Sequence, residues 1–355
     1  MNKSKVLFIL KRKGDYDTTR DSHVGMSTGL YNSASFMSDM LNEGGIESKV
    51  SVVIDNNSID REVTNYKPTH VIIEALWVVP SKFLVLTKLH PQVKWIIRLH
   101  SEIPFLANEG SAMDWIGDYI HFENVYVSPN SPRAEKDLED YIKNQTGWST
   151  REVKKKIIYL PNYYPQDYKS KQLDKTKDYI DVSCFGAIRP MKNHLIQAMA
   201  AVKFANAIGK KLRFHINHGR VEQRGDSVYK NLVSYFSHIS DSGHMLVRHN
   251  WCPREEFLEI CKTMDIGMQV SFSETFNIVA ADLTSQGVPV VSSKELPWIN
   301  KIFAANPTKT TSIYWKLLLS YWFSKFNFTT NQYLLKRYTN KTRKIWLKYF
   351  NHERK

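Results

Sequence analysis

Short apolar runs alternate with longer amphipathic segments along most of the chain. Apolar or alternating runs predict strands, because side chains along a strand point to opposite faces in turn. The strand candidates in the first part of the chain are residues 5–10, 49–54, 70–73 and 95–99, and the runs ENVYVS and KKIIYL predict two more. Residues 30–41 predict a helix that ends at Gly44 and Gly45. This alternation favours an α/β fold with parallel sheets.

The clearest predicted unit lies between residues 265 and 293. IGMQV predicts one buried strand, and VPVVSS predicts another after Gly287, the glycine that ends the helix between them. Ser271 and Ser273 are candidate N-cap residues of an intervening helix, with Glu274 in its first turn. Apolar residues then recur at helical spacing at Phe276, Val279, Ala280 and Leu283. In such a βαβ unit the helix begins at the carboxyl ends of the strands, where open α/β sheets bind ligands.

The start of this helix is a candidate phosphate site. Its N–H groups at Thr275, Phe276 and Asn277 and the positive end of its dipole favour an anion. Glu274 and Asp282 are eight residues apart, so they lie on roughly the same side of the helix. Two acids around a diphosphate suit the hydroxyl groups of a nucleotide sugar. The alternative is a plain βαβ unit in which Glu274 only favours the helix start.

Length and composition are those of an ordinary two-domain protein. The chain has 355 residues, of which 42% are hydrophobic. Cys184, Cys252 and Cys261 have neither paired nor zinc-like spacing, which indicates a reducing compartment. The apolar run near the N-terminus is too short for a signal peptide, and no run is long enough to span a membrane. We therefore expect a cytoplasmic protein.

The net charge of +14 is concentrated in two tracts. Residues 309–355 hold 11 Lys or Arg against one acid, and residues 151–178 hold eight against four. The rest of the chain is balanced. Two local basic tracts favour a specific polyanionic partner surface over general basicity.

The stretch SFSETFNIVAADLTSQGVPVV resembles the E-x7-E segment of retaining glycosyltransferases of the group 1 family, which have the GT-B fold. In that family the first Glu meets the donor sugar, the second holds the ribose hydroxyls, and the backbone between them holds phosphate. The resemblance therefore implies a sugar-binding Glu274, a ribose-binding Asp282 and a phosphate-binding segment from Thr275 to Asn277. Asp282 is shorter than the family's Glu, and Thr275 and Asn277 stand where the family often has Gly.

A second match lies before the helix that begins near residue 193. The family has the pattern G-R-x-x-x-x-K there, and its Arg and Lys bind the diphosphate. The run DVSCF predicts a strand, and Gly186 predicts the turn that follows it. Gly186 and Lys192 match the Gly and the Lys of the family pattern, but Ala187 stands at the Arg position. Arg189, two residues further on, is the candidate replacement. The alternative is a solvated loop with two cations.

The first part of the chain carries weaker matches. His100 follows a predicted strand and precedes a Pro-containing loop, the position of a family His that meets the donor sugar. Gly29 is the best match to the family's glycine-rich loop. Asp15-Tyr16-Asp17 is a D-x-D triplet, which we interpret as a loop turn because the surrounding pattern is of the GT-B kind.

The resemblance implies two Rossmann-like α/β domains that face a cleft, with C-terminal helices that cross back. The expected domains are residues 1–162 and 179–308, with a linker at 163–178 and basic helices at 309–355. The expected activity is retaining transfer of glucose or a pentose such as arabinose from a UDP-sugar. No metal is expected, because cationic side chains and the helix dipole replace it.

The acceptor is predicted from the basic tail. Basic residues interleaved with Tyr and Trp suit DNA phosphates, and equally suit anionic lipid headgroups. The candidate DNA-binding residues are Lys336, Arg337, Lys341, Arg343 and Lys344. The basic tracts and short tail look similar to DNA glycosyltransferases of T-even-type phages, which implies transfer to hydroxymethylcytosine in double-stranded DNA inside a host cell. The alternatives are a peripheral-membrane enzyme of surface polysaccharide synthesis and a non-catalytic nucleic-acid-binding protein. The oligomeric state stays open.

Overall fold

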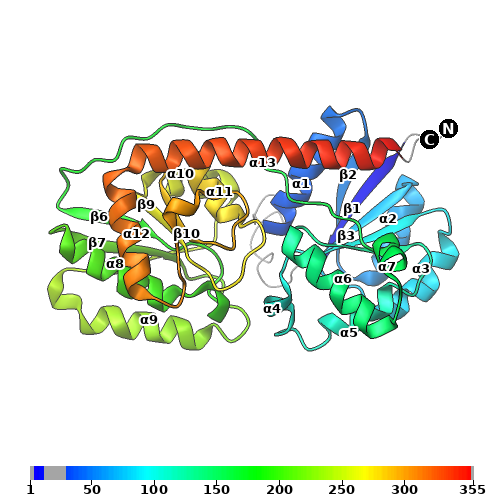
Figure 1. Ribbon diagram of the computed structural model, residues 1–355, viewed down its shortest axis with the longest axis horizontal. Helices are drawn as coiled ribbons and strands as arrows, with labels where there is room; N and C mark the ends of the chain where they lie inside the picture. Colours follow the sequence, from blue (N-terminus) through cyan, green and yellow to red (C-terminus); the bar gives the residue numbers. More distant parts are fainter. Residues whose placement is uncertain (1–3, 12–28, 353–355) are drawn as a thin grey trace. The chain divides into compact units, whose positions relative to one another are not determined.

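The computed structural model describes residues 4–11 and 29–352, which form two α/β units (Figure 1). The N-terminal unit contains the described residues up to Pro165 together with those from Thr339 onwards. The C-terminal unit contains Gln166–Tyr338. The triplet Asp15-Tyr16-Asp17 lies outside the described residues.

The N-terminal unit is built on a parallel sheet in the order β2-β1-β3-β4-β5. Its strands are β1 (Lys5–Lys11), β2 (Glu47–Val53), β3 (His70–Glu74), β4 (Lys94–Arg98) and β5 (Val125–Ser128). The strands predicted at the first four places and in ENVYVS are confirmed, with small shifts at their ends. The strand predicted in KKIIYL is wrong, because α7 (Thr150–Lys156) extends to Lys156 and Ile157 forms only an isolated bridge with Val127. The chain leaves β1 for β2 on one side and β3 lies on the other, so the strand order reverses at β1.

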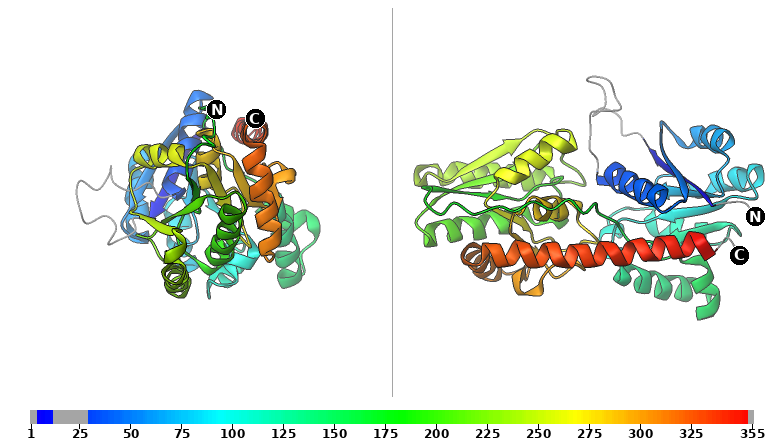
Figure 2. Two further views of the ribbon diagram at one scale, coloured as in Figure 1. Left: turned by 90° about the vertical axis from the view of Figure 1, so that its left-hand side faces the viewer. Right: turned by 90° about the horizontal axis from the view of Figure 1, so that it is seen from above.

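Helices cover both faces of this sheet (Figure 2). They are α1 (Gly29–Glu43), α2 (Ile59–Tyr66), α3 (Phe83–Leu89), α4 (Ile103–Leu106), α5 (Ala112–Tyr119), α6 (Pro132–Thr146) and α7 (Thr150–Lys156). Successive residues of β1 enter opposite layers: Leu7 belongs to one buried cluster and Phe8 to another. Burial on both faces explains why these strands read as continuous apolar runs.

The predicted first helix is confirmed, including its stop. Gly45 has φ +76°, a left-handed conformation that glycine adopts without steric cost. The Ile46 N–H donates to the Leu41 carbonyl at 2.9 Å, and the Gly45 N–H donates to the Asn42 carbonyl at 3.0 Å. This pair of bonds is the Schellman closure of a helix.

The C-terminal unit contains a second parallel sheet, in the order β11-β10-β9-β6-β7-β8. Its strands are β6 (Tyr179–Ser183), β7 (Lys211–Asn217), β8 (Met245–His249), β9 (Ile266–Gln269), β10 (Val290–Ser293) and β11 (Ala304–Ala305). Its helices are α8 (His194–Ala207), α9 (Asp226–His238), α10 (Arg254–Thr263), α11 (Ile278–Ser285) and α12 (Thr310–Trp322). The order reverses between β6 and β9, which is the topological switch point of a Rossmann fold.

The helix between β9 and β10 begins later than predicted. Asn277, rather than Ser271 or Ser273, is its N-cap, and the Asn277 side chain accepts a hydrogen bond from the Ala280 N–H at 2.9 Å. Glu274 and Phe276 therefore precede the helix, and Glu274 is not in its first turn. The reason is local: Asn277 has φ +58°, and this left-handed residue turns the loop into the helix. The predicted end at Gly287 is confirmed, with φ +76° and the same Schellman closure through Val288.

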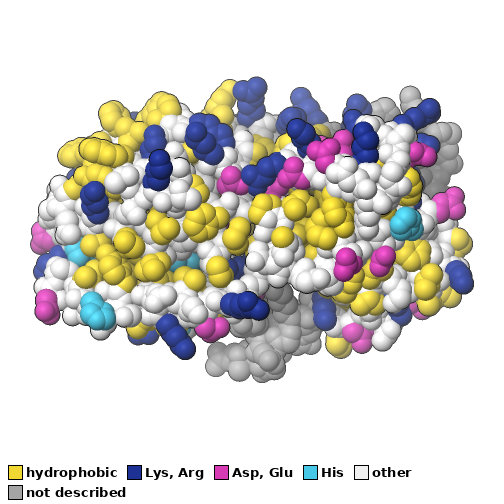
Figure 3. All heavy atoms as spheres, turned by 60° about the horizontal axis from the view of Figure 1, so that its bottom comes forward, with side chains coloured by type: hydrophobic (Ala, Val, Ile, Leu, Met, Phe, Trp, Pro, Cys, Tyr) yellow, Lys and Arg dark blue, Asp and Glu magenta, His cyan; other side chains and the backbone are white. Residues whose placement is uncertain are grey.

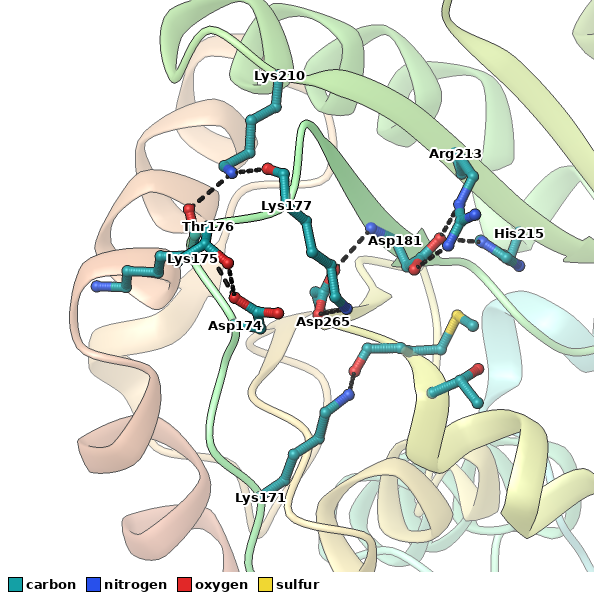
Figure 4. A network of polar contacts seen from close by, with 12 residues as sticks. Lys171, Asp174, Lys175, Thr176, Lys177, Asp181, Lys210, Arg213, His215 and Asp265 are labelled. Carbon is teal, nitrogen blue, oxygen red and sulfur yellow. Dashed lines mark hydrogen bonds and ion pairs between the residues drawn. The ribbon is translucent and has the colours of Figure 1, made fainter.

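The predicted linker is irregular, and its second half is fastened to the C-terminal unit (Figure 4). Lys171 Nζ donates to the Met264 carbonyl, and Lys177 Nζ lies 3.5 Å from Asp265 Oδ1. Asp265 also accepts the Asp181 N–H at 3.0 Å. Through these contacts a polar segment is ordered against the start of β6.

Asp181 extends this network into the sheet. Its carboxylate accepts hydrogen bonds from the Arg213 guanidinium at 2.5 and 2.6 Å and from His215 Nε2 at 2.8 Å (Figure 4). Burial alone would raise the pKa of Asp181, but His215 and Arg213 outweigh it and lower the pKa to about 2. The carboxylate is therefore charged throughout the neutral range.

The basic tail forms α12 and one long helix, α13 (Ser324–His352). Residues up to Tyr338 belong to the C-terminal unit, and residues from Thr339 belong to the N-terminal unit. Trp346 is fully buried, stacks on Phe8 with ring centroids 6.0 Å apart, and donates its indole N–H to the Pro161 carbonyl at 2.8 Å. Within residues 4–11 and 29–352, no helix has the length and hydropathy to cross a membrane.

We expect Trp346→Ala to lower the free energy of unfolding of the N-terminal unit by about 3–5 kcal/mol, because it removes a buried aromatic ring and leaves a cavity. Hydrogen exchange of the β1 amides would measure this effect. The control Lys344→Ala changes an exposed residue of the same helix and should leave exchange unaltered. Equal exchange in the two variants would contradict this account of the packing.

Candidate functional site

Two loops meet at the switch point of the C-terminal unit. One follows β6 and ends at α8; the other follows β9 and ends at α11. The Phe272 N–H in the second loop donates to the Met191 carbonyl in the first at 2.9 Å. Gln197 joins them again, because its side chain accepts the Val270 N–H at 2.8 Å and donates to the Lys192 carbonyl at 2.7 Å.

Further buried amide side chains fix the backbone of these loops. Asn193 donates to the carbonyls of Val270 and Pro307 at 3.0 and 2.8 Å. Gln269 donates to the Phe185 carbonyl at 2.9 Å and accepts a hydrogen bond from Asn277 Nδ2 at 2.9 Å. Amides suit this role because each supplies both donors and an acceptor.

Gly186 provides the tight turn that the sequence predicted after β6. Its φ of +111° lies in a region that other residues rarely adopt. Its N–H donates to the Asn217 side chain at 2.9 Å, which holds the turn against the end of β7. A glycine is therefore required by backbone conformation at this position.

The two loops bring together two residues that were predicted to bind the donor. Lys192 ends a single 3-10 turn, Pro190–Lys192, and its ammonium group forms an ion pair with Glu274 Oε1. Both side chains are largely buried, at 21% and 9% exposed. An ammonium group and a carboxylate thus lie side by side at the switch point, although they are 82 residues apart in the sequence.

Arg189 points to a different partner. Its guanidinium forms an ion pair with Glu222, whose carboxylate also accepts a hydrogen bond from Arg220 Nε. Sequence reasoning missed Arg220 and Glu222, because they lie in an irregular loop after β7 with no motif around them. The role of Arg189 as the missing family arginine stays a prediction.

Asp282, predicted to bind ribose, lies within α11 and is 2% exposed. Its carboxylate accepts a hydrogen bond from the Arg254 guanidinium at 2.9 Å, and Arg254 is the first residue of α10. Sequence reasoning did not identify Arg254. The pair places a second cation near the helix that follows the Glu274 loop.

The segment predicted to bind phosphate, Thr275 to Asn277, is buried. The Phe276 carbonyl accepts the Trp298 indole N–H at 2.8 Å. Both ends of the Asn277 side chain are engaged, one in the cap of α11 and one with Gln269. The segment is therefore held in one conformation by its own contacts.

Two further titratable groups lie beside Lys192 and were not predicted. His194 is fully buried, and neither of its ring nitrogens has a hydrogen-bond partner. Burial, together with the Lys192 charge, lowers the pKa of His194 to about 3. Burial raises the pKa of the Cys184 thiol to about 12, with Lys192 opposing and Glu274 adding to the shift. At neutral pH the imidazole is uncharged and the thiol is protonated.

In the N-terminal unit, His100 belongs to a buried ionic network at the carboxyl ends of the strands. Its Nε2 hydrogen-bonds to Glu74, and Arg98 donates to both Glu74 oxygens at 3.0 and 3.1 Å. Arg98 also donates to Asn162 Oδ1 at 2.6 Å. Burial lowers the pKa of His100, although the Glu74 carboxylate opposes the shift. Sequence reasoning identified His100 but not Glu74 or Arg98, since both read as ordinary strand residues.

The remaining predicted residues lie apart from these loops. Gly29 is the first residue of α1 and is half-buried. Along α13 the side chains of Lys336, Arg337, Lys341 and Lys344 are exposed, whereas Arg343 is half-buried. Within the described ranges, no group of three or more His, Cys, Asp or Glu is arranged to hold a metal ion.

Comparison with known proteins identifies the fold. Neither a protein-family model nor a curated protein sequence matches the chain. Sucrose-phosphate synthase from Thermosynechococcus elongatus is similar in structure, with a TM-score of 0.70, 10% identity and 98% of each chain covered. Anabaena HepE, solved in complex with UDP-glucose, has a TM-score of 0.63 and 11% identity, and the match covers 98% of this chain and 97% of HepE.

Staphylococcus aureus TarM, solved with UDP, has a TM-score of 0.61 and 13% identity. That match covers 79% of this chain, which spans only 55% of the TarM chain. These neighbours are glycosyltransferases of the GT-B class. The chain therefore has the GT-B fold, and the expected fold class is confirmed.

We expect His194→Leu to stabilise the protein increasingly as the pH falls below 6.5. A histidine with a folded pKa of about 3 resists protonation, whereas the unfolded chain binds the proton at its ordinary pKa of 6.5. Stability is therefore lost as the pH falls from 6.5 towards 3, by about 1.4 kcal/mol for each pH unit. Leucine does not bind a proton, so the variant does not lose this stability at low pH, and leucine has no polar atom that would need a hydrogen-bond partner.

Urea denaturation at several pH values would measure the difference between His194→Leu and the wild type. The control His238→Leu changes an exposed histidine on α9 and should keep the wild-type pH dependence. If His194→Leu also keeps the wild-type pH dependence, the conclusion that His194 is buried without a hydrogen-bond partner is wrong.

Proposed function

We propose that the chain is a retaining glycosyltransferase that uses a UDP-sugar donor. The observation that carries this proposal is the Lys192–Glu274 pair at the switch point of a GT-B fold. A cation and a carboxylate on adjacent, immobilised loops suit the two halves of a nucleotide sugar. HepE, which shares the fold, is solved in complex with UDP-glucose.

Each predicted residue then has a role. Lys192 binds the diphosphate, with Arg189 as the candidate second cation. At the Gly186 turn and along Thr275–Asn277, backbone N–H groups approach the diphosphate. Glu274 binds hydroxyl groups of the sugar. In the N-terminal unit, Gly29 and His100 stay the proposed donor-binding glycine and sugar-binding histidine.

Asp282 is the proposed ribose-binding acid, and its contact with Arg254 orients its carboxylate. The family's longer Glu reaches the ribose directly, whereas the shorter Asp282 side chain depends on how Arg254 holds it. We therefore assign the binding of the ribose hydroxyls to Asp282 and Arg254 together rather than to Asp282 alone.

In the reaction, an acceptor hydroxyl oxygen forms a bond to the anomeric carbon. The bond between that carbon and the diphosphate oxygen breaks, UDP leaves with the electron pair, and the proton of the acceptor hydroxyl passes to the departing diphosphate. Lys192 stabilises the charge that develops on the diphosphate, which is the kind of electrostatic contribution that dominates many enzymes. Cationic side chains supply this charge, so the proposed mechanism needs no metal ion.

For the acceptor, one candidate is hydroxymethylcytosine in phage DNA, with glucose or a pentose as the sugar. The exposed cations Lys336, Arg337, Lys341 and Lys344 on α13 support it, because a row of cations suits a phosphate backbone. The modified base would have to leave the helical stack to react.

A second candidate acceptor is a saccharide built at a membrane surface. The observation that favours it is a group of aromatic side chains exposed on α12 and α13, described below. Such side chains are typical of membrane interfaces, whereas DNA backbone contacts need only the cations.

We expect opposite effects of Glu274→Gln on binding and turnover. In the free protein Lys192 is paired with Glu274, so the neutral amide should strengthen the binding of UDP alone, by up to about 5-fold. Sugar transfer should fall by about 100-fold, because the carboxylate no longer positions the donor sugar. Lys192→Met should weaken UDP binding by about 10- to 100-fold.

Isothermal titration with UDP and turnover of labelled UDP-glucose would measure these effects. The control Glu259→Gln removes an exposed carboxylate of the same unit and should change neither quantity. If neither Glu274→Gln nor Lys192→Met changes the affinity for UDP, the proposed donor site is wrong.

Transfer of labelled sugar from several UDP-sugars would identify the acceptor. Hydroxymethylcytosine DNA, unmodified DNA and a membrane fraction with its polysaccharides would be compared. Label on the modified DNA alone supports the phage-DNA candidate, and label in the membrane fraction alone supports the surface saccharide. No donor binding and no turnover would refute the enzyme and leave a nucleic-acid-binding protein.

A further inference from the structure

Large aromatic side chains are exposed where α12 meets α13 in the C-terminal unit. We call this group the aromatic surface; it consists of Trp315 (64% exposed), Trp322 (60%), Phe323 (56%), Phe326 (49%) and Tyr333 (65%). Across residues 4–11 and 29–352, every tryptophan and phenylalanine that is more than a third exposed belongs to it. Such a concentration differs from the single exposed apolar residues that are normal on protein surfaces.

Helix geometry gathers these residues. Trp315 and Trp322 are seven residues apart on α12, and Phe326 and Tyr333 are seven apart on α13. Seven residues are close to two full turns, so each pair lies on one side of its helix. Phe323 lies at the junction between the helices. Figure 3 shows hydrophobic side chains on the surface at the upper left, with Lys and Arg side chains beside them.

The surroundings of the aromatic surface are positively charged. Between Thr310 and Tyr338 the chain has no Asp or Glu, and its basic residues are Lys316, Lys325, Lys336 and Arg337. Lys175 adds a fifth cation, since its Nζ lies 4.7 Å from the ring centroid of Trp322. Aromatic rings and cations are therefore intermixed, without an anion from either helix.

We propose that the aromatic surface docks the protein onto an anionic lipid bilayer. Trp and Tyr carry an apolar ring with one polar atom, which suits the headgroup region, and the Phe rings reach the acyl boundary. Each Lys or Arg near an anionic membrane adds about 1 kcal/mol of attraction. Lysine side chains place their stems along apolar surface and their charges among the headgroups.

The charges argue against a second copy of this chain as the occupant. A two-fold dimer would bring the same surface together with itself, so the cations of α12 and α13 would face cations of the same helices in the second copy. A nucleic acid is a polyanion, but stacking sites for bases use aromatic rings along a basic groove. Here the exposed rings are spread over two helices, α12 and α13, which suits the interface of a bilayer.

The test uses flotation of the full chain with vesicles of phosphatidylcholine alone or of equal parts phosphatidylcholine and phosphatidylglycerol. We expect binding to the anionic vesicles, weakened by salt. The double variant Trp322→Ser/Phe323→Ser should lower the partition coefficient by about 10-fold or more, because it removes two membrane-facing rings. Lys316→Glu/Lys325→Glu should abolish the preference for anionic vesicles.

The matched control is Leu84→Ser/Leu89→Ser, which removes two exposed apolar side chains of α3, 56% and 55% exposed. It should bind vesicles like the wild type. The proposal is overturned if the wild type fails to bind anionic vesicles or if Trp322→Ser/Phe323→Ser binds them normally. It is also overturned if that variant instead loses binding to single-stranded DNA, or loses a concentration-dependent dimer seen by sedimentation.

Membrane docking does not rest on the proposed function. The aromatic surface lies on α12 and α13, whereas Lys192 and Glu274 lie on the loops after β6 and β9, so UDP binding by Trp322→Ser/Phe323→Ser should equal that of the wild type. Loss of vesicle binding with intact UDP binding supports docking by itself. If UDP binding is absent in every variant, the donor site fails while docking is still judged by flotation.

Discussion

Buried backbone polar groups in the loops after β6 and β9 need hydrogen-bond partners, and this constraint shapes the C-terminal unit. A loop that enters the interior has no ladder to satisfy its N–H and carbonyl groups. Here side-chain amides do so: Gln197 spans both loops, Asn193 and Gln269 hold carbonyls, and Asn217 holds the Gly186 N–H. With their backbone held in this way, the two loops keep their charged side chains in fixed positions.

The position of the Lys192–Glu274 pair follows from that support. Each residue lies on one of the two loops, and the amides leave the loops little freedom to separate. A carboxylate and an ammonium group in contact cost less to bury than either alone, because each compensates the other's lost hydration. The N-terminal unit uses a similar arrangement, in which Arg98 pairs with the fully buried Glu74 and supports His100 through it.

The two ends of the basic tail differ in which side chains they bury. In the C-terminal part of α13, Trp346 packs into the core of the N-terminal unit, and the cations Lys341, Lys344 and Lys348 are exposed while Arg343 is half-buried. On α12 and the first part of α13 the aromatic residues divide: Tyr321 and Phe328 are buried, whereas Trp315 and Trp322 are exposed.

The sequence by itself determined the α/β class, most strands of the N-terminal sheet, the strands on either side of α11, the glycine stops at Gly45 and Gly287, and the turn at Gly186. These features depend on neighbours within a few residues, through side-chain periodicity and left-handed backbone conformation. The sequence also marked Lys192 and Glu274 as separate candidates. Its placement of the helix start failed because Asn277 competes with the serines, and its left-handed conformation is stabilised by Gln269 from the strand before it.

Only the tertiary structure decided which charges meet. Lys192 pairs with Glu274, Arg189 with Glu222 and Asp282 with Arg254, each across more than one element. It also decided which aromatic residues of the tail face water, because that depends on what α12 and α13 pack against. The ion pairs and the exposure of the tail aromatics both depend on contacts between segments that are far apart in the sequence. Residue spacing within one segment does not show which distant segment will pack against it.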